Sequence, residues 1–194
     1  MAARPGRGPA RPYRAEARRD GALEFMGREL ERERGADHPV EAPDPDHERM
    51  LADYDAAMGM AFAEIEHAFL VADGDWAARM RIALERLLTL AARNPEQARL
   101  CTIRVFEAGR AGLERRDVWM ARFTGLCESG YAQAGAGDGP PRLISPIAAG
   151  ALFELIRAHA SENRLAQLPD ALPTAVLVVL APVLGRDAAL ALAA

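Results

Sequence analysis

The sequence predicts an all-α protein, built as an orthogonal bundle of about six helices. Apolar residues recur at spacings of three and four along most of the chain after Asp46, which is the pattern of amphipathic helices. No segment shows the sustained alternation of apolar and polar residues that is typical of a strand. Half of the 194 residues are hydrophobic, which is enough to form a buried core in a chain of one-domain length.

The first 46 residues differ in composition from the rest of the chain. Up to Arg19 there are six arginines and one acidic residue, Glu16, among several prolines and glycines, which predicts a flexible basic tail. Residues 37–46 combine four acidic side chains with three prolines and predict an extended linker. Residues 15–34 can form at most one short helix. We therefore divide the chain into a tail with its linker, 1–46, and a helical domain, 47–194.

The first three helices of the domain are marked by their start and stop signals. Residues 47–72 form a long amphipathic pattern that opens with proline and aspartate. Asp75 caps the second helix, which ends at Asn94. Asn94 is then the cap of a third helix, with Pro95 at its first position, and this helix stops at Gly109.

A fourth helix is predicted over residues 113–129, followed by a glycine-rich loop over 130–141. Ser145 and Pro146 repeat the cap-plus-proline signal and open a fifth helix, which frays by Asn163. On that helix we expect Ile147 to face inward.

Residues 172–184 are apolar nearly all round, and Gly185 follows them. This predicts a last helix that is buried on most sides, either by its own fold or by a partner.

Composition narrows the classes of protein to be considered. The net charge of −4 argues against binding nucleic acid over the whole surface, because phosphate neutralisation needs a cationic excess. The apolar run 171–184 is interrupted by Pro173 and Pro182 and is shorter than the ~20 residues of a bilayer span. With no secretory pattern at the N-terminus either, we expect a cytoplasmic protein that does not bind membranes.

The polar residues do not form a recognisable catalytic or metal-binding motif. Neither a nucleophile elbow, nor a zinc-protease motif, nor a phosphate loop occurs. Glu64 and His67 stand three residues apart and could share a metal, but the second half of such a site is missing. Cys101 and Cys127 lie in apolar patterns and are interpreted as buried thiols. We therefore expect no enzyme activity, no metal and no cofactor.

From about residue 47 to 189 the chain resembles the ligand-binding and dimerisation domain of TetR-type transcriptional regulators. The residues that carry the resemblance are "HERMLADYDAAM", "DWAARMRIALERLLTLAARNPEQARL", "IRVFEAGRAGLERRD" and "LAPVLGRDAA", in this order. The family places a helix-turn-helix before this domain, where the present chain has "HPVEAPDPD". We therefore expect no complete DNA-reading unit in residues 1–46, and no specific DNA binding by this chain alone.

The resemblance implies a cavity among the central helices, where ligand sites of all-α domains form. Arg104 is one candidate for a polar residue in the wall of this cavity. The other residues expected to line it are Phe62, Leu84, Leu88, Cys101, Ile103, Phe106, Glu107, Trp119 and Phe123. Such a lining suits a small lipophilic or aromatic ligand, although each residue taken singly could also belong to an ordinary core.

The last two predicted helices are expected to form a four-helix interface in a two-fold dimer, as the family does. The alternative is that both helices are central within the monomer. The residues expected at the interface are Ala148, Ala151, Leu152, Leu155, Ile156, His159, Val176 and Leu180.

Three functional hypotheses follow from the sequence. The first is a TetR-like sensor that binds a small ligand and forms a homodimer. The second is a helical scaffold without a ligand, or a heterodimeric partner that antagonises intact regulators of the same family. The third, an enzyme, has no residue support.

Overall fold

The computed structural model of the chain describes residues 44–134 and 143–193, and these belong to one compact unit, Pro43–Ala194. Over these residues the protein is all-α and contains no strand, which confirms the predicted fold class. The basic tail, the short helix expected at 15–34 and most of the acidic linker lie outside the described residues.

The first two helices, α2 (Pro45–Val71) and α3 (Trp76–Arg93), begin at aspartate caps. Asp44 Oδ1 accepts a hydrogen bond from the Asp46 backbone N–H at 2.9 Å, and Asp75 Oδ1 accepts one from that of Ala78, also at 2.9 Å. Each cap satisfies a backbone donor that the first helical turn leaves free. The cap predicted at Asp75 is confirmed.

The predicted third helix is two elements, α4 (Pro95–Thr102) and a 3-10 helix, η1 (Arg104–Ala108). The backbone breaks at Ile103, where φ is −124° and ψ is −61°. Asn94 stands before Pro95 as predicted, but its side chain does not cap α4: its Nδ2 donates to the carbonyl of Leu90 at 2.9 Å and closes the end of α3 instead.

Helix α5 (Gly109–Ala134) is longer than the predicted helix, 113–129. At its C-terminal end it includes residues 130–134, which the sequence predicts as part of a loop. The added turn is held by tertiary packing. Gly130 lies against the indole ring of Trp76, and the buried hydroxyl of Tyr131 donates to the carbonyl of Val179 at 2.7 Å. These contacts outweigh the low helix propensity of glycine.

Three helices complete the described chain: α6 (Ile144–Ser161), α7 (Leu172–Leu184) and α8 (Arg186–Ala193), with a 3-10 helix, η2 (Leu165–Ala171), before α7. Helix α6 begins at Ile144, so Ser145 is a buried residue of its first turn and not its cap. Gly185 ends α7 with a φ of +80°, in agreement with the stop predicted there.

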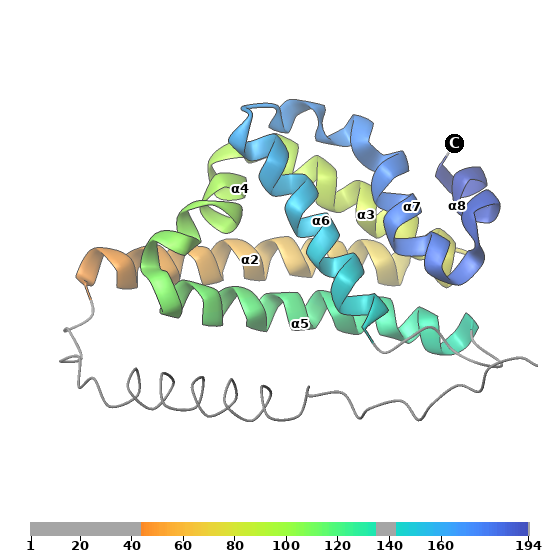
Figure 1. Cartoon of the computed structure of the whole chain (residues 1–194), viewed down its shortest axis with the longest axis horizontal. Helices are drawn as coiled ribbons and strands as arrows, with labels where there is room; N and C mark the ends of the chain where they lie inside the picture. Colours follow the sequence, from red (N-terminus) through yellow and green to blue (C-terminus); the bar gives the residue numbers. More distant parts are fainter. Residues whose placement is uncertain (1–43, 135–142, 194) are drawn as a thin grey trace, which may run out of the picture. The chain divides into compact units, whose positions relative to one another are not determined.

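The helices form two crossing sets. Helix α2 runs beside α3 and α5, and α6 crosses obliquely from α5 towards α4 (Figure 1). Helix α7 packs on α6 and α3, and α8 folds back against α7. The largest core cluster joins α3, α6, η2 and α7, and its fully buried side chains include Leu84, Leu88, Leu168, Val176 and Leu180.

Within the described residues, the segment Leu165–Leu184 is long and apolar enough to span a membrane if judged by length and composition alone. It consists of the seven residues of the 3-10 helix η2 followed by the 13 residues of α7, and 28% of its most apolar window is buried in the fold. Core helices pass the same composition test, and Val176, Val179 and Leu180 in this segment pack in the core.

Candidate functional site

The main cavity of the bundle is surrounded by α2, α3, α4, α5 and α6 and has a volume of about 360 Å³. Pockets for small organic ligands typically measure ~300–1,000 Å³. The cavity is lined by Tyr54, Ala57, Met58, Met60, Ala61, Phe62, Glu64, Ile65, Leu87, Leu90, Ala91, Asn94, Gln97, Ala98, Cys101, Thr102, Arg116, Trp119, Met120, Phe123, Ala149, Leu152, Phe153 and Ile156. Most of these side chains are apolar, so a ligand that fills the cavity would lose contact with water.

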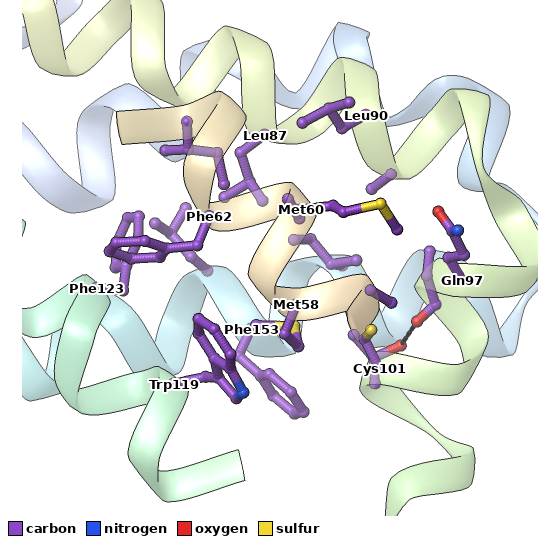
Figure 2. Close-up of a pocket in the computed structure, with 18 of the residues that line it drawn as sticks. Met58, Met60, Phe62, Leu87, Leu90, Gln97, Cys101, Trp119, Phe123 and Phe153 are labelled. Carbon is purple, nitrogen blue, oxygen red and sulfur yellow. Dashed lines mark hydrogen bonds between the residues drawn. The ribbon is translucent and has the colours of Figure 1, made fainter. Parts of the chain in front are cut away.

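Aromatic side chains from three helices form much of the wall. Phe62 comes from α2, Trp119 and Phe123 come from α5, and Phe153 comes from α6 (Figure 2). The ring centroids of Phe62 and Trp119 are 6.1 Å apart, and the rings are tilted by 50°. The Trp119 Nε1–H donates to Asp55 Oδ1 at 3.3 Å, which orients the indole. The wall therefore offers ring faces and edges to a lipophilic or aromatic molecule.

The cavity reaches solvent between α2 and the junction of α3 and α4. Met60, with 58% of its surface exposed, lines the cavity from α2, and the exposed Asn94 and Gln97 line it from the other side. Gln97 lies beside Cys101, across the cavity from Phe123 (Figure 2). The deepest wall is the buried face of α6, and a ligand would enter opposite to it.

The hydroxyl and thiol groups of the wall are uncharged at neutral pH. Burial raises the pKa of the Cys101 thiol to about 12, and burial likewise raises the pKa of Tyr54 well above its ordinary value. The hydroxyl of Thr102 is engaged, because it donates to the carbonyl of Ala98 at 2.7 Å. The hydroxyl and thiol groups thus add no charge to the wall, whose charged lining residues are Arg116 and Glu64.

A second cavity, the side cavity, shares part of its wall with the main one; its volume of about 470 Å³ is larger, but far fewer residues line it. It is lined by Thr102, Ile103, Phe106, Arg116, Gly150, Phe153, Glu154 and Arg157. Thr102, Arg116 and Phe153 line both cavities and form that wall. The rings of Phe106 and Phe153 meet edge to face, with centroids 6.1 Å apart.

The residues that the sequence predicted for a ligand site fall into three places. Phe62, Cys101, Trp119 and Phe123 line the main cavity. Leu84 and Leu88 are fully buried in the core between α3 and its neighbours and do not reach the cavity. Ile103 and Phe106 line the side cavity, while Glu107 is exposed and pairs with Arg104 at 3.7 Å. The break at Ile103 is not needed to explain this displacement: at about 100° per residue, Ile103, Phe106 and Glu107 would face away from Cys101 even in an unbroken helix. The prediction therefore combined residues from different faces of the helix.

The residues predicted for a dimer interface also divide. Ala148, Leu152, Ile156, Val176 and Leu180 are buried within this one chain. Ala151, Leu155 and His159 are partly exposed, and His159 Nδ1 lies 2.8 Å from the carbonyl oxygen of Leu155. Ile147, expected to face inward, is 61% exposed.

Sequence reasoning missed several cavity residues, above all Tyr54, Arg116 and Phe153. Tyr54 and Phe153 stand on predicted amphipathic helices, but helical periodicity does not separate a core position from a cavity wall. Arg116 is one of two adjacent arginines in "ERRD", and nothing in the sequence distinguishes it from Arg115.

No protein-family model, curated protein or solved structure matches this chain. Among residues 44–134 and 143–193, no group of three His, Cys, Asp or Glu side chains is placed to hold a metal ion. Glu64, considered above with His67, is instead paired with Arg86, whose Nε donates to Glu64 Oε2 at 3.1 Å. The geometry of the cavities is therefore the basis for assigning a function.

Proposed function

We propose that the helical domain is a sensor that binds a small lipophilic or aromatic molecule in the main cavity. The observation that carries the proposal is the cavity itself: about 360 Å³, lined mainly by apolar and aromatic side chains, and open to solvent at one end. A domain that served only as a scaffold has no need for an apolar concave site that is open to solvent, whereas such a site is typical of ligand-binding domains. The site has a small number of polar groups, as expected of a pocket that selects its ligand.

The resemblance to TetR-type regulators suggests how such binding would be used. In this proposal the domain forms a homodimer, and ligand binding changes the packing of helices that the two copies share. A heterodimer with an intact regulator of that type is the alternative assembly, in which the chain would act as an antagonist. Specific DNA binding is not assigned to this chain.

The proposal is tested by closing the cavity from one wall. Ala57 is 7% exposed and lines the cavity from α2, while its neighbour Ala56 is exposed and lines neither cavity. We expect Ala57→Phe to fill the space and to abolish binding of lipophilic compounds found by thermal shift. Ala56→Phe is the matched control and should bind as the wild type does.

A ligand at 100 times its dissociation constant stabilises the folded protein by about 2.7 kcal/mol, which a thermal-shift screen detects. The proposal fails if no compound of a lipophilic and aromatic library stabilises the wild type. It also fails if Ala57→Phe is folded and still binds the compounds that stabilise the wild type.

A further inference from the structure

We propose that the ligand of this site is a lipophilic or aromatic carboxylate, and that Arg116 binds its carboxylate group. The inference rests on the proposed function, since it names the chemical class of the ligand in the same cavity. It follows from the position, the contacts and the unused hydrogen-bonding capacity of this one arginine.

Arg116 stands in the wall between the two cavities and lines both. Its guanidinium carbon lies 4.7 Å from the ring centroid of Phe153, so the group is stacked on an aromatic face. Its Nε is buried and has no hydrogen-bond partner within the described residues. A buried donor without a partner is unfavourable. Because Nε itself is closed to solvent, a ligand oxygen would meet the Nη groups of this partly exposed side chain.

The partner that Arg116 does have is weak. Its Nη1 donates to Asp117 Oδ1 at 2.9 Å, and the Asp117 side chain is 67% exposed. Exposed ion pairs between surface side chains contribute little, so a ligand carboxylate can compete with this one. The guanidinium presents a planar fork of donors that matches a carboxylate with two parallel hydrogen bonds.

The other charges at the two cavities are already engaged. Glu64 at the rim is held by Arg86, which lowers the pKa of that carboxyl. In the side cavity Arg157 donates from Nε and Nη2 to the two carboxylate oxygens of Glu154, at 2.7 and 2.6 Å. The Arg157–Glu154 pair is also partly exposed, but it has two hydrogen bonds, whereas Arg116 makes a single one to Asp117. Of the two arginines that line the described cavities, Arg116 is therefore the less engaged, and it is the one that lines the main cavity.

A neutral donor accompanies Arg116. Tyr54 lines the main cavity, and burial raises the pKa of its hydroxyl, while the charge of Arg116 partly opposes that rise. Both groups line the main cavity, and the hydroxyl stays protonated at neutral pH. In this proposal Arg116 holds the carboxylate, the apolar part of the ligand lies along Trp119 and Phe123, and the Tyr54 hydroxyl is a neutral donor in the same wall.

The experiment compares decanoic acid with decan-1-ol, which share an apolar chain and differ in charge. Binding to the full chain is measured by isothermal titration calorimetry at about pH 7.5, where a carboxylic acid of ordinary pKa is ionised. We expect the wild type to bind decanoic acid about ten- to a hundredfold more tightly than decan-1-ol, as for hydrogen bonds to a charged group. Arg116→Met should remove that preference and leave the affinity for decan-1-ol unchanged.

Arg122→Met is the matched control. Arg122 is also on α5 and also stacks on an aromatic ring, with its guanidinium carbon 4.7 Å from the ring centroid of Trp119, but it lines neither cavity. This variant should keep the preference for the acid. Arg116→Lys keeps the positive charge but lacks the paired donors of the guanidinium, and it should retain part of the preference for decanoic acid.

Equal affinity of the wild type for acid and alcohol would overturn this inference alone and leave the proposed function standing. A preference that survives in folded Arg116→Met would also overturn it. If the wild type binds neither compound, the inference is wrong for this class of ligand, and the thermal-shift screen then decides the proposed function separately. The wild-type comparison needs no variant, so the inference remains open to refutation even if Arg116→Met does not fold.

Discussion

The thiol of Cys101 lies on the wall of the main cavity, where burial raises its pKa from 9.0 to about 12. At about pH 8 the folded protein should therefore hold a thiolate fraction ~1,000-fold smaller than the unfolded chain does. We expect Cys101 to react with an aromatic disulfide reagent several hundredfold more slowly in the native protein than in denaturant. The variant Cys127→Ala isolates this thiol, and the rate is followed by absorbance.

The same pKa shift has a consequence for stability. Above pH 9.0 the unfolded chain loses the Cys101 proton while the folded protein keeps it, so the free energy of unfolding falls as pH rises from there towards about 12. The thiol's contribution is fully present below pH 9.0. Equal rates of thiol modification in native and denatured protein would contradict both expectations.

At this scale the sequence could identify aromatic cavity residues but not the polar ones. Phe62, Trp119 and Phe123 are large apolar residues on amphipathic helices, and both a core and a cavity wall need such residues. Arg116 differs from the arginines around it through its buried Nε, its place in both cavity walls and its stacking on Phe153 of α6, all of which depend on the tertiary fold.

Tertiary packing extends α5 by a turn beyond the point where its sequence predicts the helix to end. An ideal Cβ on Gly130 would lie 1.7 Å from Cε2 of Trp76, whereas a Cβ on Gly125 of the same helix would meet nothing within 4 Å. We expect Gly130→Ala to destabilise the fold by about 1–3 kcal/mol, the usual cost of overpacking. Gly125→Ala should be stabilising by ~0.5–1 kcal/mol, because alanine favours the helix.

Chemical denaturation followed by circular dichroism measures both free energies of unfolding. If both substitutions stabilised the protein alike, the packing of the α5 end on Trp76 would be wrong, and residues 130–134 would behave as the loop that their composition indicates.

Helix limits were predictable from sequence where a cap or a stop has its own chemistry, and not elsewhere. The Asp75 side chain accepts a hydrogen bond from a backbone N–H of the first turn of α3, and Gly185 adopts the positive φ that ends α7. The start of α3 and the end of α7 therefore follow from residue type. The break at Ile103 has no proline or glycine to announce it, so the separation of α4 from η1 does not follow from residue type. The misplacement of Phe106 and Glu107 has another cause, because neither shares a face with Cys101 even in an unbroken helix.

On the scale of the whole molecule, the described part of the chain leaves an apolar ridge on α6. Ile147, Ala151 and Leu155 follow one another at spacings of four, with Ile147 61% exposed and the other two partly exposed. Ridges of this spacing interdigitate when two helices pack. The prediction of a dimer thus now rests on this ridge, because much of the predicted interface is buried within the chain itself.

We expect light scattering of the purified protein to give twice its mass of 21.0 kDa. Ile147→Glu places a charge on the ridge without disturbing the core, since the residue is exposed, and should give the monomer. Val118 of α5 is 60% exposed, against 61% for Ile147, so Val118→Glu is a matched control that should leave the dimer intact. A monomeric wild type at micromolar concentration would refute the homodimer. An intact dimer in Ile147→Glu would show that the interface lies elsewhere, and dissociation by both variants would show that the effect is not specific to the ridge.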